Sequence, residues 1–215
     1  MDKLIGKARS KVFFFLLLVF CNLSIVLTIG ALPALEFSMG FADAWTNTQS
    51  TATGYHNGWN FSADANWLFR ISIDNKNLTK VEEKIPSRVS TILSPGLHVQ
   101  YISMSASNWL SDGSRYRAWS AIGLGPELEF GLEFLDSIMM HKNSLLFSMA
   151  YLANFSNYTQ TTLYSAYNSW LLKVSWNTKI DRGPAFFAAL PLEFAFRADG
   201  KSVLSGLVMG IRYEF

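Results

Sequence analysis

The chain has 215 residues, of which 50% are hydrophobic and 15% aromatic, while only 16% are charged, against about 25% in average proteins. Its formal net charge of +2 is too small to predict a nucleic-acid partner or an acidic substrate. The length fits a single folded domain.

The N-terminal segment differs in composition from the rest. Residues 1–11 are basic, residues 12–35 are apolar and uncharged, and small residues lie near Ala31. This layout predicts a secretory signal, residues 1–34, cleaved between positions 30 and 35 and followed by a mature domain, 35–215. A retained anchor helix is the alternative, because the apolar run is long enough to span a membrane. Cys21 is the only cysteine, so the mature chain should contain no disulfide or Cys-based metal site.

From residue 35 onward, apolar and polar residues alternate with a period of two, which is typical of β-strands. Strands are predicted at 35–45, 59–74, 88–103, 116–134, 144–155, 167–177, 185–197 and 204–215. The stretch 59–74 alternates most regularly and exceeds the about 9–11 residues that a tilted transmembrane strand requires. The pattern predicts an all-β fold, a closed eight-stranded antiparallel up-and-down transmembrane barrel.

Aromatic residues cluster towards the two ends of the apolar strand faces. The predicted aromatic girdle contains Trp45, Trp59, Trp119, Trp170, Trp176, Phe37, Phe134, Tyr213 and Phe215. Two such belts are favoured at membrane–water interfaces. A soluble lipid-carrying barrel is the alternative, but it would place apolar residues inside and charges outside.

The opposite strand faces carry the charged residues, which we therefore expect in the barrel lumen. These are Glu36, Arg70, Arg88, Glu127, Glu129, Glu133, Lys173, Glu193, Arg197, Arg212 and Glu214. Charges in a narrow interior must be paired, because burying one alone is unfavourable by several kcal/mol. Strand order predicts two pairs, Glu36 with Arg212 and Arg88 with Glu133.

The end of the chain carries a recognisable signature. Ile211, Tyr213 and Phe215 alternate with polar or small residues, and Phe215 is terminal. This pattern resembles the C-terminal signature of bacterial outer-membrane β-barrels. The resemblance implies export through the periplasm, integration into the outer-membrane lipid and recognition by the barrel-assembly machinery.

Two further features are similar to the small OmpW/OprG family of outer-membrane barrels. Pro95 and Pro126 lie within neighbouring predicted strands, where proline marks an edge or bulge, so they are candidates for a lateral opening. Apolar residues also fall on the lumen face: Leu68, Ile92, Leu146, Leu152, Leu171 and Phe187. No motif fixes this family, so barrels of the OmpX and OmpA type remain the second choice.

Catalytic and metal chemistry find little support. His56, His98 and His141 fall on different parts of the predicted barrel, and no outward His lies near a Ser, so we expect no enzyme. The carboxylates Glu127, Glu129 and Glu133 share one strand face and are interpreted as lumen charges rather than acid–base groups. No cofactor or metal is predicted.

The sequence thus predicts an outer-membrane barrel that gives passive passage to small solutes, hydrophobic ones included. The alternative is a plugged barrel whose loops bind host or environmental ligands. Aromatic-rich stretches, Tyr55 to Trp59 and Tyr158 to Tyr167, are expected in such loops.

Overall fold

The structure is a computed structural model that describes residues 32–48, 53–72, 88–136, 141–157, 165–180, 183–197 and 200–215. Residues 33–215 form one compact unit. The expected signal segment lies outside the described residues except for positions 32–34, which already belong to the first strand, and Cys21 also lies outside them. No helix within the described ranges is long and apolar enough to cross a membrane.

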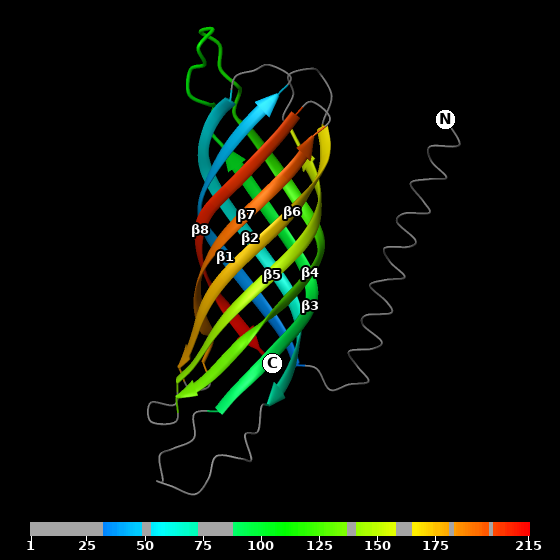
Figure 1. The fold of residues 1–215 in the computed structure, drawn as a ribbon, viewed down its shortest axis with the longest axis vertical. Coiled ribbons are helices and arrows are strands. Elements are labelled where there is room, and N and C mark those ends of the chain that lie inside the picture. Colours follow the sequence, from blue (N-terminus) through cyan, green and yellow to red (C-terminus); the bar gives the residue numbers. More distant parts are fainter. Residues whose placement is uncertain are drawn as a thin grey trace, which may run out of the picture. The chain divides into compact units, whose positions relative to one another are not determined.

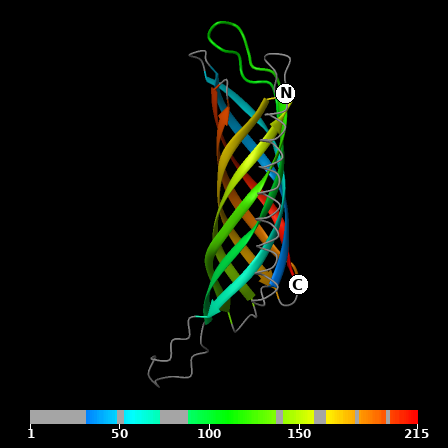
Figure 2. The ribbon, with the colours of Figure 1, turned by 90° about the vertical axis from the view of Figure 1, so that its right-hand side faces the viewer.

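Eight strands form a closed barrel in which neighbours in sequence are neighbours in the sheet. They are β1 (Leu32–Thr48), β2 (Thr53–Ser72), β3 (Arg88–Met104), β4 (Trp119–Asp136), β5 (His141–Ser156), β6 (Ser165–Ile180), β7 (Ala185–Arg197) and β8 (Gly200–Glu214). Figures 1 and 2 show the tilted strands winding around a common axis. The predicted fold class is confirmed.

The last strand closes the barrel. β8 runs antiparallel to β1, with Tyr213 opposite Leu35 and Arg212 opposite Glu36. The backbone N–H of Phe215 donates to the carbonyl of Pro33 at 3.0 Å. Closure leaves no unpaired sheet edge, which is the condition for a β-structure to lie in hydrocarbon.

Side chains alternate strictly across the barrel wall. Along β7, every odd position from Ala185 to Arg197 is buried and every even position is exposed. The exposed positions of the barrel carry Leu, Ile, Val, Met, Phe and Trp, whereas the buried ones include most of the charged side chains. This arrangement is the inverse of a soluble lipid carrier, whose apolar side faces inward.

Strand β2 begins earlier than the sequence indicates. The stretch Tyr55 to Trp59, predicted as a loop, is part of β2, which starts at Thr53. The alternation continues through these polar residues, because His56 is buried while Tyr55 and Asn57 are exposed. The loop prediction was wrong because it relied on polarity rather than on period.

The prolines do not open a window between β3 and β4. The ladder between these strands is unbroken from Arg88–Leu135 to Met104–Trp119, and Pro95 lies opposite Leu128 within it. The interruptions lie on the other side of each proline, towards β2 for Pro95 and towards β5 for Pro126. Proline lacks the N–H that the ladder requires on that side. The predicted break between β3 and β4 at Pro95 and Pro126 is therefore wrong.

Candidate functional site

The lumen is filled by stacked layers of side chains. Its centre is a group of ionisable residues from six strands, which we name the central charge cluster: Glu36, Asp64, His98, Glu127, Glu129, Lys173 and Arg212. All seven are buried. Every lumen charge predicted from the sequence lies on the inner face or rim, except that the side chain of Arg88 falls outside the described part of the structure.

Lys173 of β6 is the cation at the middle of this cluster. Its Nζ donates to Asp64 Oδ2 at 2.8 Å and lies 3.3 Å from Glu127 Oε1 and 3.7 Å from Glu36 Oε2. His98 bonds the other carboxylate oxygen of Asp64 through Nδ1. Lys173 therefore connects three carboxylates that come from β1, β2 and β4.

Arg212 of β8 occupies the seam where the barrel closes. Its guanidinium lies 2.7 Å from Glu36 Oε1 and donates to Glu129 Oε1 at 2.7 Å. The predicted pair of Glu36 and Arg212 is present. Because Glu36 lies on β1 and Glu129 on β4, Arg212 also spans the lumen.

A second set of charges lies at the near end of the barrel, where β1 begins and β8 ends. Arg70 donates to Glu133 at 3.2 Å and to Glu214 at 2.6 Å, and Lys179 donates to Glu214 at 2.9 Å. Glu133, predicted to pair with Arg88, is bonded to Arg70. The sequence could not distinguish these cations, because both lie near the same rim.

Layers of apolar side chains lie between the charged groups of the lumen. Towards the near end, Leu68, Ile92 and Leu146 form one buried cluster with Ala34. Leu152, Leu171 and Phe187 are also buried. All six predicted apolar lumen residues therefore point into the interior of the barrel. Towards the far end, at the connections of β1–β2 and β3–β4, a further cluster includes Ile102, Met104 and Leu204.

Trp119 belongs to this far-end layer and not to the aromatic girdle. Its side chain is 2% exposed and lies under the guanidinium of Arg197, which also covers the ring of Tyr167. Assigning Trp119 to the outer face was wrong. The sequence alone could have placed Trp119 correctly, because it occupies an odd position on β4, as do the lumen residues Glu127 and Glu129. The other predicted girdle residues point outward: Trp45, Trp59, Trp170, Trp176, Phe37, Phe134, Tyr213 and Phe215.

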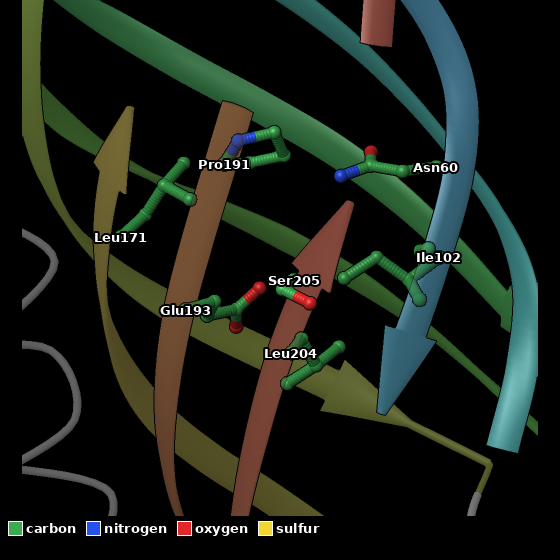
Figure 3. A pocket seen from close by; sticks show the side chains of 8 residues that line it. Asn60, Ile102, Leu171, Pro191, Glu193, Leu204 and Ser205 are labelled. Carbon is green, nitrogen blue, oxygen red and sulfur yellow. The ribbon is translucent and has the colours of Figure 1, made fainter. Parts of the chain in front are cut away.

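A cavity inside the wall lies beside Glu193, with a volume of ≈ 10 Å³. Asn60, Ile102, Leu204 and Ser205 line it from the other strands (Figure 3). One oxygen of Glu193 accepts a hydrogen bond from Gln100 at 2.8 Å. The space is about that of one water molecule, so this cavity is too small for a larger solute.

Asp64, His98 and Glu127 bring possible metal-ligand atoms within 4.8 Å of one another. The sequence interpretation missed this group because it considered the histidines together and left Asp64 out. Lys173 lies within 3.3 Å of both carboxylates. The position between them already holds a positive charge, which favours an internal ion pair over a bound cation.

The connection between β3 and β4 forms an ordered projection, residues 105–118, which we name the far-end hairpin. The N–H of Ser107 donates to the carbonyl of Tyr116 at 3.0 Å, and the N–H of Leu110 donates to that of Ser114 at 2.8 Å. Gly113 turns the chain with a φ of 76°, a conformation that favours glycine. Figure 1 shows this green loop beyond the end of the barrel. The predicted loop residues 158–164 lie outside the described residues, and Tyr167 points into the lumen.

A closed antiparallel barrel with an apolar outside and a charged inside defines the class of outer-membrane β-barrels. No family model and no curated protein matches the chain. Among solved structures it is similar to neisserial surface protein A, with 11% identity over 85% of this chain and 99% of that chain and a TM-score of 0.45. It is also similar to the attachment invasion locus protein Ail of Yersinia pestis, with 11% identity over 84% of this chain and 98% of that chain and a TM-score of 0.34. A third similar structure is that of the outer membrane protease OmpT from Escherichia coli, with 6% identity over 86% of this chain and 97% of that chain and a TM-score of 0.38.

Proposed function

We propose that this outer-membrane barrel is closed to solutes and acts through its far end, by binding ligands outside the cell. The observation that carries this proposal is the filled lumen. Apolar layers lie on both sides of the central charge cluster, and ion pairs join β6 and β8 to β1, β2 and β4 across the interior.

Passage of solutes through the lumen has less support. A solute moving along the axis would have to displace Lys173 from three carboxylates and then pass between Leu68, Ile92 and Leu146. Breaking such buried pairs is unfavourable by several kcal/mol. A lateral route between β3 and β4 is not supported either, since the ladder between these strands is continuous at Pro95.

Binding at the far end is supported by the order of the hairpin. Besides its own hydrogen bonds, the hairpin is tied to β2, since Asn108 N–H donates to the carbonyl of Tyr55 at 3.0 Å and Tyr55 N–H donates to Asn108 Oδ1 at 2.8 Å. A preorganised loop loses less conformational entropy when a ligand binds. Exposed loops on a rigid barrel are also where binding residues concentrate.

Planar-bilayer recording tests whether the barrel is closed. We expect the refolded protein to produce no current steps above the bare-membrane baseline, because buried apolar layers and ion pairs cross its lumen. A general porin inserted into the same membranes serves as the positive control. Regular current steps from the protein would contradict the proposal and favour solute passage.

A further inference from the structure

The far-end hairpin is fixed at its base by aromatic packing. The buried ring of Tyr116 stacks on His56 of β2, with centroids 6.2 Å apart and an interplanar angle of 23°. A Cβ added at Gly54 would lie 2.3 Å from the Tyr116 ring, so only glycine permits this approach. His56 also bonds the carbonyl of Ser105 through Nδ1 at 2.8 Å. The hairpin is therefore an extension of the barrel wall rather than a separate loop.

One face of the hairpin presents two guanidinium groups and an indole ring. Arg115 and Arg117 flank the buried Tyr116, and in extended chain this spacing directs both of them away from it. Trp109 is 67% exposed, and the guanidinium of Arg115 lies 4.9 Å from its ring centroid. We name these three residues the basic–aromatic face.

The acidic residue of the hairpin, Asp112, is hydrogen-bonded within the turn. Asp112 Oδ1 accepts hydrogen bonds from the N–H of Ser114 at 2.9 Å and from its hydroxyl at 2.6 Å. These bonds lower the pKa of Asp112. The carboxylate thus stabilises the turn, and no ion pair joins it to Arg115 or Arg117 among the described contacts.

The height of the hairpin separates its tip from the membrane. Ser103 pairs with Trp59 of the girdle, and Trp109 follows six residues later (103 to 109). The rise is shorter than six extended residues, because the N–H of Asn108 donates to the carbonyl of Tyr55, which lies four residues from Trp59 on β2. Four extended residues span about 13 Å, of which strand tilt leaves about 10 Å along the membrane normal. The polar layer of a bilayer is only about 6 Å deep on each side. Trp109 therefore lies beyond the headgroups.

We propose that the basic–aromatic face binds an anionic carbohydrate, a sugar chain bearing sulfate or carboxylate groups. Guanidinium groups recognise such anions through paired, charge-assisted hydrogen bonds, and the flat indole face of Trp109 provides a surface for the apolar side of a sugar ring. Arg115 and Arg117 are about 6.6 Å apart along an extended strand, a spacing that allows contact with neighbouring anionic groups on one chain. This inference rests on the proposed function, since it requires ligand binding at the far end.

Binding of dextran sulfate and of neutral dextran to the refolded protein tests the inference. The protein is placed in nanodiscs of phosphatidylcholine, so that no anionic lipid competes. We expect dextran sulfate to bind and neutral dextran not to, and the double variant Arg115→Gln/Arg117→Gln to bind dextran sulfate about tenfold more weakly. Trp109→Ala should weaken binding as well, whereas Lys201→Gln, which removes an exposed far-end cation outside the hairpin, should leave it nearly unchanged.

Three outcomes would overturn the inference: equal binding of both polymers, equal losses in the Lys201 and arginine variants, or a loss seen only on vesicles of phosphatidylglycerol. The last result would assign the arginines to lipid phosphates. Heat-modifiable gel migration of each variant shows that the barrel has folded. None of these three outcomes bears on whether the barrel is closed to solutes. Current steps in a planar bilayer, in contrast, would overturn the proposed function itself.

Discussion

Replacing Lys173 with Met is expected to destabilise the barrel by about 3–5 kcal/mol, the range for breaking a buried ion pair from one side. The substitution retains the length of the side chain but removes its ammonium group. Asp64 would lose a hydrogen bond of 2.8 Å, and Glu127 would lose the cation 3.3 Å away. Neither carboxylate oxygen of Glu127 accepts a hydrogen bond within the described part of the chain. Urea unfolding of the refolded protein in detergent micelles measures the loss.

Two further variants show whether charge is the cause. Lys142→Met removes a cation whose side chain is 38% exposed and lies 3.9 Å from Glu133, and we expect a loss below about 1 kcal/mol. Adding Asp64→Asn and Glu127→Gln to Lys173→Met should recover much of the stability, because the carboxylates would no longer be buried without a cation. Equal losses at Lys173 and Lys142 would show that the central charge cluster is not a stabilising core.

Introducing Arg at Met149 should destabilise the barrel by about 2–4 kcal/mol, as for a cation at the bilayer midplane. Met149 lies in the middle of β5 between Leu128 and Leu172 and is 43% exposed on the outer face. An arginine there would face hydrocarbon. Unfolding of the refolded protein in phosphatidylcholine vesicles gives the free energy.

Phe155→Arg is the matched control for Met149→Arg. Phe155 is on the same strand and face but near its far end, and it is 59% exposed. Here the arginine reaches the interface, so we expect a loss of about 0–1 kcal/mol. If the outer face met water instead of lipid, both variants would change stability by less than about 0.5 kcal/mol.

Most of the fold could be predicted from the sequence, because a closed barrel shows a period of two repeated over eight strands. Which side of the wall each residue takes follows from parity, as Glu36 and Trp45 show. Trp119 was misplaced where residue type was preferred to parity. The stretch at Tyr55 was misplaced for a similar reason, since polar composition does not end a strand that continues to alternate.

The candidate site depended on information that a single sequence does not contain. Lys173 meets Glu36, Asp64 and Glu127 because the tilt and stagger of the strands bring β6 level with β1, β2 and β4 across the lumen. Adjacent pairs are easier to predict, as Glu36 and Arg212 show. The basic–aromatic face was missed because its residues were divided between a loop and a strand predicted to begin at residue 116, whereas β4 begins at Trp119.

Site-directed spin labelling along β5 tests most directly that the apolar face meets lipid while the charged face is enclosed. Single cysteines are placed at positions 145–152 after Cys21→Ser, and collisions of each label with oxygen and with a water-soluble nickel chelate are measured in vesicles. Labels at Phe147, Met149 and Tyr151 should collide often with oxygen and rarely with nickel, and labels at Ser148 and Ala150 rarely with either. Frequent nickel collisions at Met149, or free access of nickel to Ala150, would contradict a lipid-facing exterior around a closed lumen.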